Sequence, residues 1–126
     1  MKSDAFKRAA EALDFAAGAE LFTEDVVFNS PVVFKPYEGR DSLTVVLGAV
    51  VQVFKDFRYV GQVEDDDTAV LMFEARAGER DVQGVDILKF SDDGLISELT
   101  VMVRPMSGML ALADEMKKML EAAGAA

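Results

Sequence analysis

The sequence predicts an α+β fold in which helices pack against one face of an antiparallel β-sheet. Apolar residues recur at helical spacing near both ends of the chain and again over residues 43–54. From residue 57 to residue 105 the apolar residues instead alternate with period two, which is typical of strands. Turn residues divide this second part into successive strands. A run of strands beside separate helices is the pattern of an α+β domain.

Composition excludes several kinds of chemistry. The chain has 126 residues, of which 51% are hydrophobic, so we expect a single domain over residues 1–126 with a proper core. It has no histidine and no cysteine, which excludes zinc sites and Ser-His-Asp or Cys-His catalysis. The net charge of −10 disfavours nucleic acid and anionic membranes as partners. No secretory signal or membrane-spanning run is recognised, so a cytoplasmic location is expected.

The first helix is predicted to begin at Ser3 or Asp4, either of which can cap it. Residues 19–23 are expected to form a short second helical piece. Residues 26–34 read as a strand, but Pro31 cannot donate to a ladder, so this strand is predicted at an edge or broken near the proline. The apolar stripe of the first helix consists of Phe6, Ala9, Ala10, Leu13, Ala16 and Ala17.

A further helix is predicted over residues 42–57, capped by Asp41 or Ser42. It is rich in valine, which is a poor helix former, so tertiary packing must stabilise it. Its apolar residues fall at i, i+3, i+4, i+7, i+8 and i+11, and they are Leu43, Val46, Leu47, Val50, Val51 and Phe54.

Two hairpins and a last helix complete the prediction. The first hairpin joins residues 57–64 to 68–78 across the acidic turn at 65–67, and the second joins 80–90 to 95–105. Asp93-Gly94 in the second turn is a strong hairpin signal. The acidic turn lacks the spaced ligands and glycine of an EF-hand, so no metal site is predicted. A helix over residues 107–124 follows, with Ser107 as its N-cap.

Asp86 interrupts the apolar strand of the second hairpin and shares a face with Val82, Leu88 and Phe90. Buried carboxylates are rare unless they are paired. One interpretation is a pocket acid that binds or deprotonates a ligand. The other is a structural aspartate that is hydrogen-bonded to Ser30, a backbone amide or water.

The two tyrosines, Tyr37 and Tyr59, are expected at the boundary of the core with their hydroxyl groups in water. Residues 69–73 and 99–103 are apolar on both strand faces. One face would meet the helices, and the other would remain bare unless something covers it. A symmetric copy of the chain is the simplest cover, so a homodimer is predicted.

The order and spacing of four segments resemble the nuclear transport factor 2-like (NTF2-like) superfamily and, within it, the SnoaL-like proteins. The segments are LFTEDVVFNSPVV at 21–33, YEGRDSL at 37–43, FKDFRY at 54–59, and VDILKFSDDGLISELTVMVRP at 85–105. The resemblance implies a cone-shaped fold in which a curved antiparallel sheet wraps around N-terminal helices, with a C-terminal helix. It also implies an interior pocket and frequent homodimers.

The superfamily includes ketosteroid isomerases, which use an aspartate base and an oxyanion hole of tyrosine and protonated aspartate. Asp86 matches the protonated aspartate of that group, but the base position is Ser30 and the tyrosine position falls near Phe6. Isomerase activity is therefore not expected. The epoxide hydrolases need an Arg-x-Asp pair and a further aspartate, and neither is found. Cyclases use an inner-strand aspartate, which Asp86 could supply, but their helper residues are absent.

These observations predict a small-molecule-binding SnoaL-like protein, with a small apolar molecule as candidate ligand and no cofactor. An isomerase or cyclase that uses Asp86 as general acid or base is the first alternative, and a non-catalytic dimeric interaction module with a closed core is the second. Asp86 is the candidate catalytic residue. The predicted ligand-binding residues are Phe6, Leu13, Phe28, Ser30, Val50, Phe54, Phe73, Leu88, Leu99 and Val101.

Overall fold

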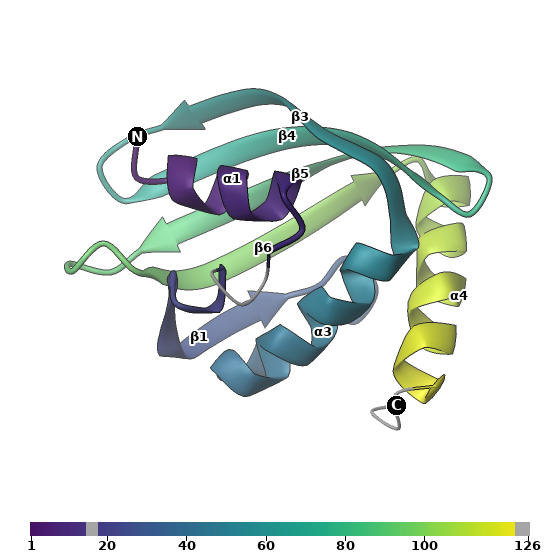
Figure 1. Ribbon diagram of the computed structural model, residues 1–126, viewed down its shortest axis with the longest axis horizontal. Coiled ribbons are helices and arrows are strands. Elements are labelled where there is room, and N and C mark those ends of the chain that lie inside the picture. Colours follow the sequence, from purple (N-terminus) through teal and green to yellow (C-terminus); the bar gives the residue numbers. More distant parts are fainter. Residues whose placement is uncertain (15–17, 123–126) are drawn as a thin grey trace.

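A curved six-stranded sheet dominates the part of the chain that this computed structural model describes, residues 1–14 and 18–122 (Figure 1). The strands lie in the order β2-β1-β6-β5-β4-β3. The pairing of β1 with β6 is parallel, and every other pairing is antiparallel. The bounds are β1 Phe22–Asn29, β2 Tyr37–Glu38, β3 Phe54–Glu64, β4 Thr68–Ala77, β5 Arg80–Phe90 and β6 Ile96–Arg104.

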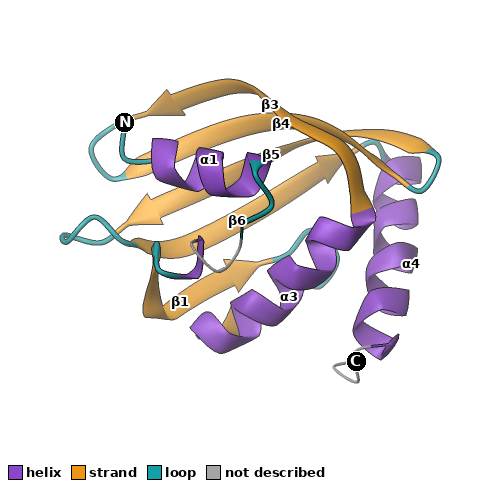
Figure 2. Cartoon of the chain, in the orientation of Figure 1, coloured by secondary structure: helices purple, strands orange, loops and turns teal. Residues whose placement is uncertain are grey.

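Three helices lie against this sheet within the described residues: α1 Asp4–Glu11, α3 Arg40–Val53 and α4 Met106–Ala122. Helices α1 and α3 lie on the concave side, and α4 crosses one end of the sheet (Figure 2). Helix α4 contacts α3 and the strands β4, β5 and β6. This arrangement confirms the predicted α+β fold, with N-terminal helices inside a curved sheet and a C-terminal helix. None of the described helices is long and apolar enough to cross a membrane.

Several predicted boundaries and caps are wrong. Helix α1 ends at Glu11, so Leu13 lies beyond it, and Ser3 at its N-cap makes no side-chain capping hydrogen bond. Helix α3 begins at Arg40 after Gly39, so Asp41 and Ser42 lie inside it, and Ser107 likewise lies inside α4.

The strand predicted at 26–34 is β1, which begins at Phe22 and ends at Asn29, so residues 22–23 are not helical. The reason is packing: the Phe22 side chain is fully buried and meets the ring of Phe6 edge-on at 6.1 Å. The loop from 30 to 36 follows because Pro31 cannot continue the ladder.

The predicted end of α3 is wrong as well: the helix was predicted to reach residue 57 but ends at Val53. Phe54 adopts an extended backbone and begins β3, which pairs with β4 from Phe54 onward. Aromatic residues favour strands, and the ladder with β4 outweighs the helical spacing of Phe54. The predicted helical positions Ala16 and Ala17, and the predicted end of the last helix at 123–124, lie outside the described residues.

Strand β3 bends sharply because its register with β4 shifts twice, between Lys55 and Arg58 and again between Tyr59 and Gly61. Asp56, inside the first irregularity, has a positive φ of 54°. Such bulges bend a strand and increase its twist. The strand consequently curls over the helices and turns Tyr59 toward the interior of the sheet.

The N-terminal segment is held to the far end of β3. Glu64 accepts hydrogen bonds from the Ser3 backbone amide at 2.9 Å and from the Ser3 hydroxyl at 2.7 Å. Gln62 donates to the same hydroxyl at 2.7 Å. These contacts fix the start of α1, whose Phe6 side chain points into the core. Helix α1 is thereby positioned over the inner face of the sheet.

Candidate functional site

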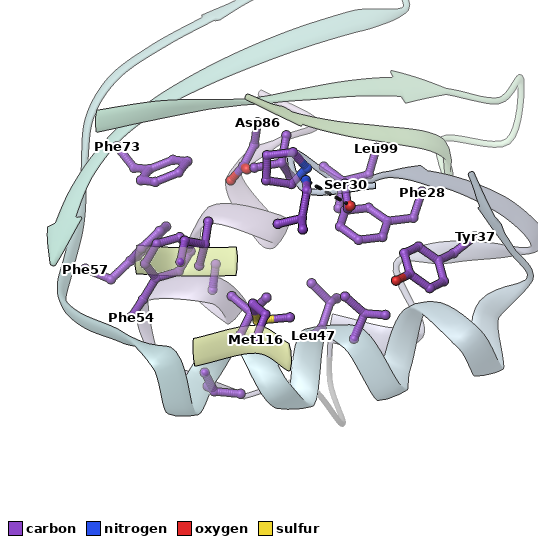
Figure 3. A pocket seen from close by; sticks show the side chains of 18 of the residues that line it. Phe28, Ser30, Tyr37, Leu47, Phe54, Phe57, Phe73, Asp86, Leu99 and Met116 are labelled. Atoms are coloured by element: carbon purple, nitrogen blue, oxygen red, sulfur yellow. Dashed lines mark hydrogen bonds between the residues drawn. The ribbon is translucent and has the colours of Figure 1, made fainter. Parts of the chain in front are cut away.

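A cavity of about 410 Å³ lies between the concave face of the sheet and the helices α1, α3 and α4 (Figure 3). This volume is within the usual range of small-molecule sites, about 300–1,000 Å³. Its walls are almost entirely apolar. The polar side chains among its described lining residues are Ser30, Tyr37, Tyr59, Asp86 and Lys117.

The cavity brings together ten of the eleven residues that the sequence singled out. Leu88 is the exception. It faces the same way as Asp86 but lies two residues nearer the turn, where it pairs with Ala69 and Leu99 in the closed core and is fully buried. Whether the other ten bind a ligand remains a prediction; they are Phe6, Leu13, Phe28, Ser30, Val50, Phe54, Phe73, Asp86, Leu99 and Val101.

Asp86 is the acid of the cavity. It lies near the middle of β5, flanked by β4 and β6 through its partners Leu71 and Val101, and its carboxylate points into the cavity (Figure 3). The residue is only 6% exposed. The hydroxyl of Tyr59 donates a hydrogen bond of 2.6 Å to its Oδ2. Ser30, the partner considered from sequence, instead accepts hydrogen bonds from the backbone amides of Val32 and Val33.

Burial controls the protonation of this pair. It raises the pKa of the Asp86 carboxyl from about 3.8 to about 7, and the hydrogen bond from Tyr59 partly opposes that rise. The pKa of Tyr59 is also raised, chiefly by burial and then by the neighbouring Asp86, so Tyr59 remains protonated at neutral pH. Asp86 therefore populates both of its protonation states near neutral pH. In the neutral state its hydroxyl can donate to an oxygen atom of a ligand.

Tyr59 is a candidate site residue that the sequence analysis did not select, because its hydroxyl was expected in water; the hydroxyl instead bonds to Asp86. A signal was nevertheless present in the sequence. Strand alternation places Phe57 and Tyr59 on the same inward face, opposite Arg58. A buried carboxyl group needs a hydrogen-bond donor. Tyr59 was one of few candidates, and the bend in β3 that brings it within reach of Asp86 was not predictable.

Aromatic rings line the wall beside Asp86. Phe73 contacts the rings of Phe57, at 4.9 Å between centroids, and of Phe54, at 5.6 Å (Figure 3). Tyr59 meets Phe57 edge-on at 5.0 Å. Gly84 lies opposite Phe73 across the ladder, and a Cβ atom at Gly84 would overlap the Phe73 ring. The absence of a side chain at Gly84 thus lets Phe73 complete this wall.

The mouth of the cavity can be located from lining residues that also reach the surface. Leu13 is 53% exposed, Val32 41% and Val33 42%. Leu13 follows α1 with a positive φ of 57°, which is unusual for a leucine. Lys117 of α4 is exposed as well. The opening is therefore bordered by the end of α1, the loop after β1, and α4.

The cavity combines apolar walls with one buried carboxyl group. Its lining contains one carboxyl group, Asp86, and in the described part of the chain no cluster of three or more acidic side chains could hold a metal ion. A second carboxylate that would act as a separate base beside Asp86 is absent from the described lining. Proton transfer at this site would depend on Asp86, to which Tyr59 donates a hydrogen bond.

The curved sheet, the enclosed helices and the apolar cavity define a protein of the NTF2-like class. The chain belongs to the SnoaL-like domain family, whose model matches residues 4–99. This confirms the resemblance seen in the sequence. No curated protein matches the chain significantly.

Solved structures agree with this assignment. A steroid delta-isomerase from Pseudomonas aeruginosa is 41% identical, with a TM-score of 0.90 over 96% of this chain and 90% of that one. A protein from Silicibacter pomeroyi DSS-3, described as uncharacterized and as having a cystatin-like fold, is 32% identical, with a TM-score of 0.93 over 98% of this chain and 87% of that one. A putative SnoaL-like polyketide cyclase from Shewanella denitrificans OS-217 shares the fold at 16% identity and a TM-score of 0.69, over 93% and 95% of the two chains.

Proposed function

We propose that this protein binds a small, largely apolar molecule that carries one hydrogen-bonding oxygen, and that Asp86 recognises this oxygen. The single observation that carries the proposal is a buried carboxyl group, with a pKa of about 7, in the wall of an otherwise apolar cavity. Burying a polar group costs free energy unless it finds a partner. Tyr59 occupies one oxygen of the carboxyl group and leaves the other to face the ligand.

A matched pair of ligands tests this proposal. 1-Tetralone and tetralin share a bicyclic skeleton and differ by a ketone oxygen, which can only accept a hydrogen bond. Below about pH 7 the neutral Asp86 should give the ketone an advantage of about three- to tenfold in Kd over the hydrocarbon. The advantage should decline as pH rises through the pKa of Asp86. Asp86→Leu, which is similar in size and cannot titrate, should remove this dependence of the advantage on pH.

A separate pair of variants tests whether the ligand binds in the cavity. Val50 lines the cavity on α3, whereas Val45 is on the same helix and 49% exposed. Val50→Phe should weaken binding of both compounds, and Val45→Phe should leave it unchanged. Equal binding of ketone and hydrocarbon to the wild-type protein would contradict the role of Asp86. Binding unaffected by Val50→Phe would contradict the cavity as the site.

A second candidate function is acid–base catalysis of the isomerase type. Two observations favour it: the pKa of Asp86 lies near neutral pH, where a proton-transfer group works best, and a 41% identical protein is described as a steroid delta-isomerase. Against it, the position of the family's base is Ser30, whose hydroxyl binds the loop backbone. The position of the family's tyrosine falls near Phe6, although Tyr59 brings a tyrosine hydroxyl to Asp86 from β3.

The catalytic candidate is tested by turnover of a Δ5-3-ketosteroid, followed by the absorbance of the conjugated product. If Asp86 is the proton-transfer group, Asp86→Asn should abolish turnover while binding persists. Absence of turnover in the wild-type protein would rule out this candidate and leave the binding proposal standing. The third expectation from sequence, an interaction module with a closed core, is not supported by a cavity of this size.

A further inference from the structure

One lysine interrupts the apolar stripe that α4 presents to the cavity. Ala113, Met116, Lys117 and Leu120 all line the cavity, and they are spaced i, i+3, i+4 and i+7. This spacing places the four side chains on one face of the helix. Lys117 therefore lies within the cavity-facing stripe, where an apolar residue would continue the pattern. Among the described lining residues it is the one cationic side chain.

No contact within the described protein accounts for this charge. The next residue, Lys118, pairs with Asp114 at 3.1 Å and with Glu115 at 3.8 Å. Lys117 has neither a salt bridge nor a side-chain hydrogen bond to any residue that the structure describes. Glu121, at i+4, is exposed, yet no ion pair joins it to Lys117 within 4.0 Å. Lys118 thus has acidic partners and lies outside the cavity lining, whereas Lys117 lines the cavity and has no such partner among the described residues.

We propose that the ligand of this cavity carries an anionic group, such as a carboxylate or sulfonate, and that Lys117 binds this group at the cavity mouth. This inference rests on the proposed binding function and specifies the chemical class of the ligand. The molecule would be an amphipathic acid, with its apolar body inside and its charge at the rim. Its hydrogen-bonding oxygen would lie at the opposite, buried end, against Asp86.

The charge of the whole protein makes a local cation advantageous for binding an anion. With a net charge of −10, the protein repels anions at long range. A positive group at the site would offset this repulsion for an anionic ligand. The alkyl stem of a lysine can cover apolar surface while its ammonium group remains hydrated, which suits a residue that lines a cavity and is also exposed. Asp86 and Lys117 are then two separate polar groups of the site, because Asp86 is hydrogen-bonded to Tyr59 and not to Lys117.

Two dyes with the same ring skeleton test the inference. N-phenyl-1-naphthylamine is neutral, and 8-anilinonaphthalene-1-sulfonate adds one sulfonate to it. Both become fluorescent in apolar cavities, and Kd is measured by titration into wild-type protein and into Lys117→Gln. Lys118→Gln is the matched control, because it removes an equal charge from the next position of the same helix, outside the cavity lining.

Lys117→Gln should raise the Kd of the sulfonate dye about two- to fivefold, as expected for the loss of one exposed ion pair, and leave the Kd of the neutral dye unchanged. Added salt should shrink that difference, because exposed charges are screened. Lys118→Gln should change neither dye. An equal loss for both dyes would show that Lys117 acts only through packing of its stem, and no loss would show that it contributes nothing. Either result overturns the inference.

The design separates this inference from the proposed function. Displacement of the neutral dye by the sulfonate dye should show that they share the cavity. If the neutral dye fails to bind the wild-type protein, the binding proposal itself fails. If the neutral dye binds and the sulfonate dye binds without displacing it, the cavity stands as a binding site and the anion subsite at Lys117 is refuted. Unfolding midpoints equal to wild type would confirm that the variants are folded.

Discussion

Protonation of one residue, Asp86, governs how stability depends on pH at this site. Burial raises the pKa of Asp86 to about 7, so between about pH 4 and pH 7 the folded state binds more protons than the unfolded state. Stability from this group is fully present below the unfolded pKa and is lost as pH rises through the folded pKa. Tyr59 limits the loss, because its hydrogen bond stabilises the charged form.

Replacing the acid should remove this dependence. We predict that the free energy of unfolding of the wild-type protein falls relative to that of Asp86→Asn by ~1.4 kcal/mol per pH unit across this window. Urea unfolding of both proteins between about pH 4 and pH 8 measures the difference. Only the difference is diagnostic, because other acids titrate in both proteins. A wild-type protein that gains stability relative to the variant with rising pH would show an ionised, well-paired carboxylate instead.

Tyr59→Phe should act in the opposite pH range. Without its donor, the pKa of Asp86 should rise further, and the charged carboxylate would be left buried without a partner. We predict a loss of ~1–3 kcal/mol in unfolding free energy above about pH 8, and a smaller loss near pH 5. Tyr37→Phe is the control, since Tyr37 also lines the cavity but is not the donor to Asp86. Equal losses at both pH values would mean that the hydroxyl does not serve the carboxylate.

Part of this site could be predicted from the sequence. The alternation of β5 placed Asp86 among core residues, and it is buried there. The same alternation could not reveal its partner, because Tyr59 belongs to β3 and β4 lies between the two strands. The contact depends on the bulges of β3, which bend the strand. Bulge positions follow from pairing across the sheet and leave little trace in local composition.

Among the elements, β5 leaves room at Gly84 for the ring of Phe73, its partner on β4. In Gly84→Ala, the added Cβ would overlap that ring and lie 2.6 Å from the carbonyl oxygen of Met102. We predict a destabilisation of ~1–3 kcal/mol, together with weaker ligand binding, because Phe73 must move into the cavity. Thermal and urea unfolding measure the first effect, and dye titration measures the second.

Gly48→Ala is the matched control for Gly84→Ala. A Cβ at Gly48 meets nothing within 4 Å, and the residue lies inside α3. Alanine is favoured over glycine in a helix interior by up to ~1 kcal/mol, so this variant should be more stable than wild type. Changes of opposite sign in the free energy of unfolding for the two substitutions would support the packing argument. A neutral Gly84→Ala would show that Phe73 can relax without cost.

Element boundaries were predictable where packing and periodicity agreed. The hairpin of β5 and β6 formed as expected, with Gly94 at a positive φ of 83° in its turn. The end of α3 was not predictable, because Phe54 fits the helical stripe and also begins a strand. Competition between these two environments is decided by the ladder with β4, which is a tertiary contact. The parallel pairing of β1 with β6 is likewise a property of the assembled sheet.

For the whole molecule, the convex face of the sheet is the unexplained surface. Val60, Val63, Met72 and Met102 are exposed there, and Val60 and Met102 reach 58% and 55%. Exposed apolar patches on soluble domains mark interaction sites. We propose that a second copy of the chain covers this face in a symmetric dimer, as the doubly apolar strands predict.

Two charges on the convex face test this proposal. Ile87→Lys with Met102→Lys should give a monomer in sedimentation equilibrium, whereas the wild-type protein should be a dimer. Neither side chain lines the cavity, so ligand binding should persist in the monomer. Val45→Lys, on the exposed side of α3, is the control and should not alter the mass. A double variant that remains dimeric would place the interface elsewhere.

The two tyrosines provide the molecule with an optical signal of its own. The chain contains no tryptophan, and both Tyr37 and Tyr59 line the cavity. Ultraviolet emission from the protein should therefore originate almost entirely at the cavity wall. Tyr59 should be the dimmer emitter because a carboxylate accepts its proton in the excited state, while Tyr37, stacked on Phe28 at 5.9 Å, should supply most of the light. An unlabelled molecule that enters the cavity should thus change the intrinsic fluorescence directly, without a probe dye.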